Sequence, residues 1–333
     1  MLRRGASPPR PLEHPIAVAC GVVTPAPSGP TDVGRGVRAG IVAYTLWGLL
    51  TIYWKQLTGF NAFELIGWRI MSASVVMAVV VSMRGRWPTI RAAFADRHLA
   101  MRIGIAAALL TANWTSYVYA VVHDRVIETA LGYFMAPLGT MVLGITVLKE
   151  RPSGAQKVTF VLAAAAVVQL SVSYGRPPIA ALVIAVSWSV YSLLKRRVPL
   201  PAIESFAAES FVLVVPAAIV VAAAAGLTDS IPRGADASQL ALVSLSGVST
   251  AVPLILFAFA AARVPFTVLG PLQYFVPSIN FVLGWALYGE ELPWTRLVGF
   301  GLVWVALLIV TVDGVHGTVT RRGAARIPAV SAD

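Results

Sequence analysis

Long apolar segments recur along the chain from Arg38 onward, with short polar connections between them. A helix needs about 20 mostly apolar residues to cross a bilayer. The segments that approach this length are residues 38–56, 64–83, 99–121, 130–148, 155–174, 178–194, 204–225, 239–262, 267–288 and 294–313. Because the connections are short, consecutive helices are expected to be antiparallel neighbours. The pattern therefore predicts an all-α integral membrane protein with ten transmembrane helices.

The two ends of the chain lack this pattern. Residues 1–36 contain seven prolines, which remove helix donors and fix φ, so we expect a disordered cytoplasmic tail there. Residues 315–333 follow the last apolar segment and are expected to form a second cytoplasmic tail.

The composition agrees with a chain embedded in lipid. Of the 333 residues, 57% are hydrophobic and 12% are charged, whereas a soluble protein carries about 25% charged residues. So few charges cannot coat a water-facing surface, which argues against a soluble enzyme, a disordered protein and a nucleic-acid binder. The single cysteine, Cys20, excludes an internal disulfide.

The net charge of +11 reflects basic residues that gather on one side of the membrane. Lys and Arg collect in cytoplasmic loops. With the N-terminus in the cytoplasm, 20 of the 26 basic residues fall on the cytoplasmic side. The six others are Lys55, Arg69, Arg125, Arg176, Arg233 and Arg296. This asymmetry predicts that both termini are cytoplasmic, which requires an even number of helices.

The two halves of the chain resemble each other at a shift of 140 residues, so residues 37–174 and 177–314 are predicted to be five-helix repeats. The matched positions include Glu64 with Glu204, Pro137 with Pro277 and Glu150 with Glu290, and Trp47 matches Trp188 at a shift of 141. Because five is odd, the second repeat must enter the membrane from the opposite side. Inverted repeats are the architecture of many secondary transporters, with a substrate site near the midplane. The alternative is a duplication that only built a larger helical bundle.

Several short motifs resemble those of RarD-type proteins in the EamA branch of the drug/metabolite transporter superfamily. They are Ala112-Asn113-Trp114, Leu131-Gly132-Tyr133-Phe134 with Pro137, Thr250-Ala251-Val252-Pro253-Leu254, Leu269-Gly270, Gln273-Tyr274 with Pro277, Gly289-Glu290 and Asp313-Gly314. The resemblance covers about residues 37–314. It implies two EamA-like repeats in a bacterial cytoplasmic membrane and export of small molecules. The chain departs from the family pattern at Trp68, Ala136 and Pro271, which bears on the substrate more than on the fold.

Polar side chains within the spans are the candidate substrate-cavity residues, because polar groups in lipid face the bundle interior or a water-filled path. Asn113 and Tyr117 share one helix face. Tyr133 precedes Pro137 by one turn, as Gln273 precedes Pro277, and each proline leaves a carbonyl without its helical donor. The other candidates are Tyr274, Asn280 and the matched aromatics Trp47 and Trp188. Kinked helices with ordinary interhelical hydrogen bonds, or interfacial tryptophans, are the alternatives.

Charged residues and prolines near the span ends give a second group of candidates. Lys55 and Arg69 form a possible charge site, and Arg69 lies about 8 Å deep. It could bind an anionic group, pair with Glu64, or snorkel to the interface. Glu150 and Glu290 are interpreted as gate or loop anchors, and Pro137, Pro253 and Pro277 as helix breaks.

These observations predict a secondary transporter, an exporter of drugs, amino acids or metabolites, that works by alternating access. Its expected partners are a small-molecule substrate and the lipid bilayer, without nucleic acid, cofactor or metal. One chain holds both halves, so a monomer suffices, and a dimer stays open. The coupling ion also stays open, because the acids lie near span ends and only Glu209 lies about a turn inside. The alternatives are a membrane receptor or scaffold, and an integral membrane enzyme, which the scattered histidines disfavour.

Overall fold

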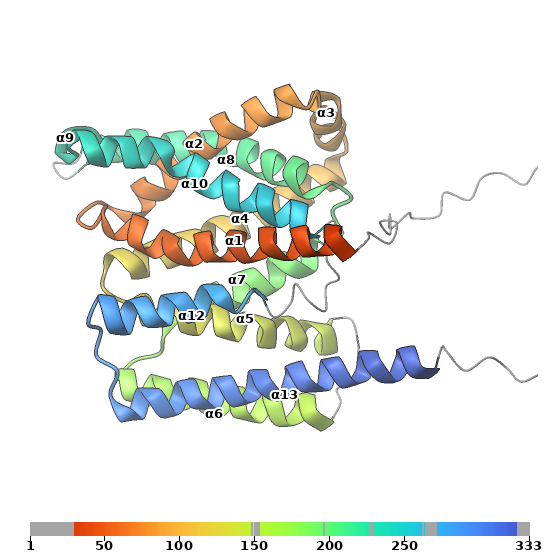
Figure 1. Ribbon diagram of the computed structural model, residues 1–333. Helices are drawn as coiled ribbons and strands as arrows, with labels where there is room; N and C mark the ends of the chain where they lie inside the picture. Colours follow the sequence, from red (N-terminus) through yellow and green to blue (C-terminus); the bar gives the residue numbers. More distant parts are fainter. Residues whose placement is uncertain are drawn as a thin grey trace, which may run out of the picture.

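The computed structural model describes residues 30–147, 149, 154–195, 197–226, 230–261, 263 and 272–324. In this part of the chain every regular element is helical, and the long helices lie side by side with roughly parallel axes (Figure 1). The long helices are α1 (Pro30–Lys55), α2 (Ala62–Met83), α4 (Arg97–Val122), α5 (Val126–Thr146), α6 (Gly154–Tyr174), α7 (Ile179–Lys195), α8 (Ala202–Ala224), α10 (Ala237–Ala261) and α13 (Trp294–Ala324). The short ones are α3 (Trp87–Ala95), α9 (Ile231–Gly234), α12 (Phe275–Val282) and the π-helical turn η1 (Leu283–Leu287).

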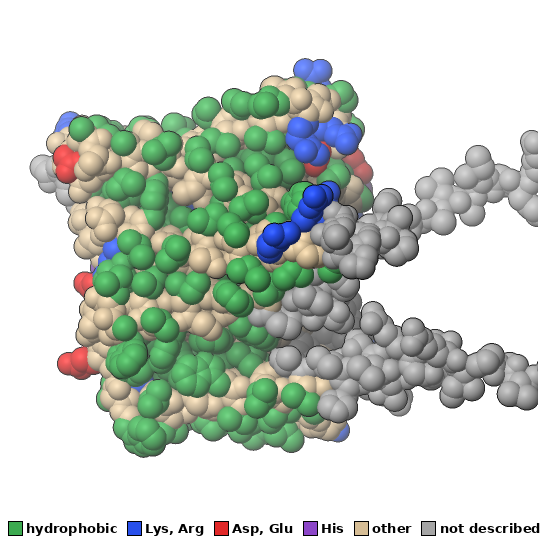
Figure 2. Space-filling view, viewed as in Figure 1, with side chains coloured by type: hydrophobic (Ala, Val, Ile, Leu, Met, Phe, Trp, Pro, Cys, Tyr) green, Lys and Arg blue, Asp and Glu red, His purple; other side chains and the backbone are tan. Residues whose placement is uncertain are grey.

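Six of the described helices are long and apolar enough to cross a membrane, namely α1, α2, α4, α6, α8 and α10. Shorter apolar helices cover Ile179–Lys195, Phe275–Leu287 and Trp294–Ile309. Large apolar side chains cover the surface between the two ends of the bundle, whereas the charged side chains gather toward those ends (Figure 2). Val172 and Val75, for example, are 74% and 66% exposed. An apolar belt of this kind requires lipid as its solvent.

The helices extend beyond several of the predicted spans. The helix α1 begins at Pro30, inside the stretch expected to be a tail, because proline is tolerated in a first helical turn. At the other end α13 continues to Ala324, since hydropathy marks where a helix crosses lipid and not where it ends. The helix α3, in the connection after α2, was not predicted. Of the ninth predicted span, 267–288, the structure describes only residues 272–288.

The closest helix pairs join the two halves of the chain. Helix α1 packs along α10 and α12, and its counterpart α7 packs along α4 and α5. Likewise α2 packs on α8, and α6 lies beside α13 at one edge of the bundle (Figure 1). Each pairing made by a helix of one half is also made by the corresponding helix of the other half, as expected for two similarly folded repeats. The matched residues Glu64 and Glu204 are both buried in the first turn of their helices.

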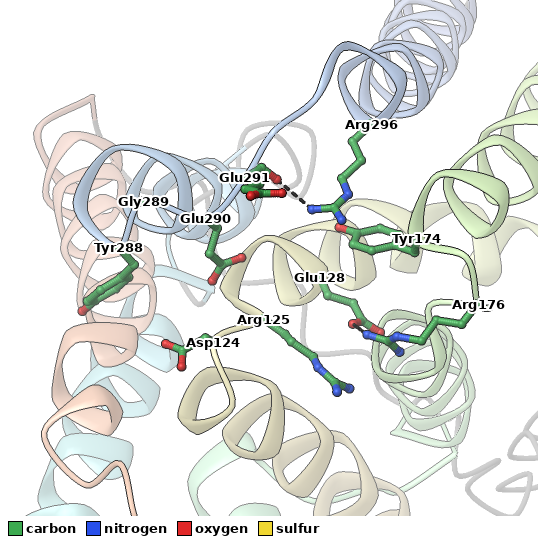
Figure 3. A pocket seen from close by; sticks show the side chains of 10 residues that line it. All are labelled: Asp124, Arg125, Glu128, Tyr174, Arg176, Tyr288, Gly289, Glu290, Glu291 and Arg296. Atoms are coloured by element: carbon green, nitrogen blue, oxygen red, sulfur yellow. Dashed lines mark hydrogen bonds and ion pairs between the residues drawn. The ribbon is translucent and has the colours of Figure 1, made fainter.

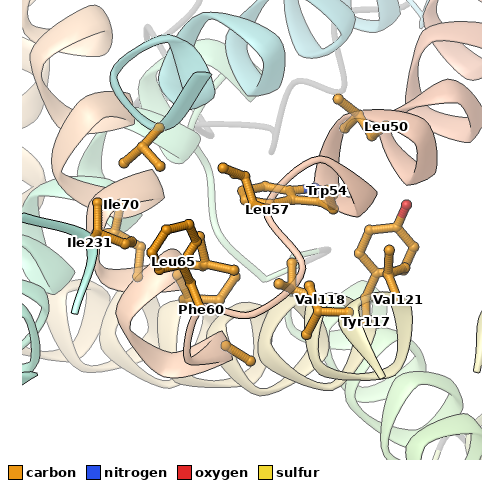
Figure 4. Packing of buried hydrophobic residues seen from close by; sticks show 14 of the residues in the cluster. Leu50, Trp54, Leu57, Phe60, Leu65, Ile70, Tyr117, Val118, Val121 and Ile231 are labelled. Atoms are coloured by element: carbon orange, nitrogen blue, oxygen red, sulfur yellow. The ribbon is translucent and has the colours of Figure 1, made fainter. Parts of the chain in front are cut away.

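A buried apolar cluster fills the space between α1, α2 and α4. Trp54 in the last turn of α1 and Leu57 just after this helix lie beside Leu65 of α2 and Val118 of α4 (Figure 4). The hydroxyl of Tyr117 projects from the edge of this cluster (Figure 4). The cluster thus forms an apolar wall beside the polar groups that the sequence singled out.

Candidate functional site

Two of the predicted cavity residues, Tyr117 and Asn280, belong to one buried chain of hydrogen bonds. Thr51 Oγ1 donates to Asn280 Oδ1 at 2.8 Å and lies 2.9 Å from the Tyr117 hydroxyl. Because a hydroxyl has one hydrogen, Tyr117 must donate to Thr51. Asn280 Nδ2 then donates to Thr129 Oγ1 at 3.3 Å, and Thr129 donates to the Val126 carbonyl. The chain links α4, α1, α12 and α5, so it crosses from one half to the other.

Asn113 and Tyr133, also predicted, form a second polar contact next to the first. The Tyr133 hydroxyl donates to Asn113 Oδ1 at 3.1 Å, and Asn113 Nδ2 donates to the carbonyl of Ile184 on α7 at 3.0 Å. The rings of Tyr117 and Tyr133 lie 6.0 Å apart, edge to face. The structure therefore brings four of the predicted residues into one region between the halves. These amides are satisfied within the protein, as buried polar groups in lipid must be.

Arg69 lies deeper than the sequence suggested. Helix α2 begins at Ala62, which places Arg69 about 10 Å along it at about 1.5 Å per residue. Its side chain is 3% exposed, and Nε donates to Thr250 Oγ1 on α10 at 3.0 Å. Its guanidinium carbon lies 4.0 Å from the ring centre of Trp114 and 5.4 Å from that of Trp54. Arg69 is thus enclosed in the bundle and does not snorkel to the interface.

The structure describes both Arg69 and Glu64 and shows no ion pair between them, which was one of the possibilities for Arg69. The Glu64 carboxylate accepts from the backbone N–H of Ile231 at 3.0 Å and faces the start of α9. Lys55, the other member of the possible charge site, makes an ion pair with Asp124. The two cations therefore lie in different places: Lys55 is at the end of the bundle and Arg69 is inside it.

The remaining predicted cavity residues lie away from these polar contacts. Trp47 packs on Tyr44 and on Phe257 of α10, with ring centres 5.6 and 5.8 Å away. Trp188 packs on Tyr191 at 5.6 Å. Their place in a cavity stays a prediction.

The three prolines predicted to be helix breaks occupy different positions in their helices. Pro137 lies inside α5 and Pro253 inside α10, and both helices continue through them. Pro277 falls in the first turn of α12, where a missing N–H is of little consequence. Gln273 and Tyr274 form the turn before that helix, and Tyr274 lies 6.5 Å from the Phe134 ring. Tyr133 and Gln273 are therefore not in equivalent helical positions, because only the first precedes a proline within one continuous helix.

A polar pocket of about 370 Å³ opens at the end of the bundle where α1 ends and α5 begins. Figure 3 shows acids and arginines from three connections, and from the first turns of α5 and α13, gathered around this pocket. The Glu290 carboxylate accepts from the backbone N–H groups of Val126 and Ile127, the latter at 2.9 Å. It therefore caps α5, where the helix dipole favours a negative charge. Glu150, its predicted counterpart, lies outside the described residues.

A pH-dependent stability is expected from Glu290. Burial raises its pKa above the usual value, and the two backbone N–H groups and Lys55 oppose the shift. A carboxyl with a raised folded pKa stabilises the fold most below its unfolded pKa, and the contribution is lost as the pH rises through the folded pKa. The melting temperature of Glu290→Gln, relative to that of the natural chain, should therefore rise as the pH is raised from about 4 to about 7. Glu291→Gln, at the exposed neighbour, is the control. If the melting temperatures of Glu290→Gln and the natural chain differed by the same amount at about pH 4 and at about pH 7, the expectation would be contradicted.

A buried ion pair near the opposite end of the bundle was not predicted. Glu209 on α8 is fully buried and accepts from Lys195 Nζ at 2.6 Å and from the Tyr191 hydroxyl at 3.1 Å. Lys195 also donates to Ser205. The sequence showed an acid a turn inside α8 and a basic α7 end, but not their contact.

A model of the EamA-like transporter family matches the chain twice, over residues 34–172 and 176–312. This chain belongs to the EamA-like transporter family. The duplication seen in the sequence is thus a duplication of the EamA domain.

Named relatives extend the match over most of the chain, and the resemblance to RarD-type proteins is confirmed. The chain is similar to Protein RarD of Streptomyces exfoliatus, with 36% identity covering 89% of this chain and 93% of the relative. It is also similar to the Uncharacterized transporter YojE of Bacillus subtilis, with 33% identity covering 84% and 94%. Protein RarD of Escherichia coli is 30% identical, over 85% of this chain and 95% of the relative. The chain is therefore a multi-span membrane transporter of the drug/metabolite family.

A solved structure with 18% sequence identity shares the fold, with a TM-score of 0.53 over 83% of this chain and 97% of that one. The likeness concerns the arrangement of helices alone.

Proposed function

We propose that this protein is a secondary transporter that exports small organic molecules across the bacterial cytoplasmic membrane. It has ten membrane-crossing helices in two inverted repeats, residues 37–174 and 177–314, and both termini are cytoplasmic. The observation that carries the proposal is the buried polar and aromatic region between the halves. Helices α1, α2, α4 and α5 of the first half meet α7, α10 and α12 of the second half there. A site at the interface of two repeats is where alternating access requires it.

The contacts at the Glu290 end suggest how such access is controlled. Glu290 caps α5, and Lys55 of α1 pairs with Asp124 in the connection between α4 and α5. Under the proposed orientation this is the outer end. Opening toward the outside then requires the connection after η1 to move away from the N-terminus of α5. The expected trigger is a substrate that binds the outward-open state more tightly, since a ligand shifts an equilibrium only by its differential affinity.

Relatives give the range of compounds to be tested. The chain is 27% identical to the Chloramphenicol-sensitive protein RarD of Pseudomonas aeruginosa, over 83% of this chain and 93% of the relative. Amphenicols therefore join amino acids and organic acids in the panel.

Reconstitution into liposomes tests the function. The full chain is inserted into vesicles, and radiolabelled members of the panel are followed with and without an imposed proton or sodium gradient. At least one compound should cross faster than in protein-free vesicles, and more slowly with Asn280→Leu, which breaks the Thr51 to Thr129 chain. Flux equal to that of protein-free vesicles across the whole panel would overturn the proposal.

The inverted arrangement predicts that equivalent connections face opposite sides of the membrane. Thr58 follows α1 and Pro199 follows α7; they are 141 residues apart and both exposed. In a Cys20→Ser background, Thr58→Cys should react with an impermeant maleimide added outside intact cells. Pro199→Cys should react only after the cells are opened. Labelling of both from the same side would contradict inverted repeats.

A further inference from the structure

Arg69 holds an uncompensated positive charge inside the bundle. Among the described residues, the ionisable side chains that interact with it electrostatically are three phenols, those of Tyr53, Tyr117 and Tyr133, which are neutral at pH 7. Within the described residues no carboxylate oxygen lies within 4.0 Å of its guanidinium. A buried charge in lipid is costly unless it is paired, and contacts with aromatic rings offset only part of that cost.

The guanidinium also has unused hydrogen-bond donors. Nε donates to Thr250, but the structure gives Nη1 and Nη2 no hydrogen bond to any described residue. The indole Nε1 of Trp54, whose ring faces the guanidinium, is buried and likewise has no acceptor there. Donors therefore outnumber acceptors around Arg69. Such a surplus selects a ligand that brings acceptor oxygens, and a guanidinium fork matches the two oxygens of a carboxylate.

We propose that Arg69 is the anchor of the transport site and that it binds the carboxylate of an amphipathic monocarboxylic acid. The aromatic rings of Trp54 and Trp114 receive the apolar body of the ligand. One positive charge balances one negative charge, so a dianion would leave an excess charge in a low dielectric. A zwitterion would bring an ammonium group, and the three phenols offer it no counter-charge. The inference rests on the proposed transport function and adds its substrate class.

A series of isosteres tests this assignment in the full chain in detergent. The probes are 3-phenylpropionate, its neutral amide, the zwitterion phenylalanine and the dianion phenyl phosphate. Because Trp54 and Trp114 contact Arg69, binding should be visible as saturable quenching of tryptophan fluorescence. We expect 3-phenylpropionate to bind at least about 10-fold more tightly than each of the other three.

Variants separate recognition from structural support. Arg69→Met should weaken 3-phenylpropionate binding by about 10- to 100-fold and leave the amide almost unaffected. Arg69→Lys should retain part of the preference, because it keeps the charge but loses the planar fork. Arg91→Gln, an exposed site on α3, removes a charge elsewhere and should change neither affinity. A structural role alone would lower the thermal stability of the unliganded Arg69→Met protein without changing the ratio of carboxylate to amide affinity.

The outcomes are distinct. Equal binding of acid and amide, tighter binding of phenylalanine or phenyl phosphate, no saturable quenching by 3-phenylpropionate, or a preference that survives Arg69→Met would each overturn the assignment. If the liposomes transported a neutral compound and showed no preference for carboxylates, the proposed transport function would stand and the assignment of Arg69 would be wrong. Carboxylate-selective binding without flux of any probe would keep the site and contradict the proposed function.

Discussion

Replacing Lys195 by methionine should lower the free energy of unfolding by about 3 kcal/mol, because it leaves a buried carboxylate without its cation. The side chain of Glu209 is 1% exposed and that of Lys195 is 25% exposed. Without Lys195, the donors to the Glu209 carboxylate that remain among the described residues are the hydroxyls of Tyr191 and Ser205. Methionine preserves most of the apolar stem of lysine, so lost packing contributes little. Unfolding of the purified protein by a titration with SDS, followed by circular dichroism, gives the measurement.

The partner substitution provides the control. Glu209→Gln removes the negative charge and leaves Lys195, which reaches water through its exposed quarter, so this variant should be clearly less destabilised. The double variant Lys195→Met with Glu209→Gln should recover part of the stability lost in Lys195→Met, because no charge is left buried. Additive losses in the double variant would show that the ion pair is not the source of the effect.

The fold could be largely predicted from the long apolar segments because lipid imposes one dominant requirement. Every backbone group in the hydrocarbon must be hydrogen-bonded, so each apolar segment becomes a helix. Residues such as 62–83 in α2 and 202–224 in α8 follow the predicted spans closely. The helix ends outside lipid do not obey this requirement, which is why α1 and α13 extend beyond their predicted bounds. The π-helical turn η1 has no hydropathy signal at all.

The site was accessible from sequence only where a strongly polar side chain interrupts an apolar run. Asn113 and Asn280 stand out in this way, and the structure joins Asn113 to Tyr133 directly and Asn280 to Tyr117 through Thr51. Thr51 and Thr250 were missed because a hydroxyl is common in membrane helices, where it satisfies the helix carbonyls. Their roles depend on partners 229 and 181 residues away in the chain. Such contacts follow from the packing of the two halves, which periodicity within one helix does not encode.

The second large effect is expected at Gly247, where α10 lies directly against the backbone of α2. Gly247 of α10 faces the backbone of Ser72 and Ala73 on α2, and its N–H donates to Ser72 Oγ at 2.9 Å. An added Cβ would overlap the Ser72 carbonyl group and the Ala73 nitrogen. Backbone atoms cannot rotate away as a side chain does, so α2 and α10 would have to separate. Gly247→Ala should therefore destabilise the protein by about 3 kcal/mol, the upper part of the usual range for overpacking.

Gly104→Ala in α4 is the matched control, because a Cβ there meets nothing within 4 Å. This substitution should stabilise its helix slightly, since alanine has the higher helix propensity. The two variants thus make the same chemical change with opposite expected signs, measured by SDS titration as above. Separation of α2 from α10 would also move Thr250 away from Arg69, so the Gly247→Ala protein should show weaker tryptophan quenching by 3-phenylpropionate. Equal stability of the two variants would mean that α2 and α10 do not pack in contact, and the enclosure of Arg69 would lose its structural basis.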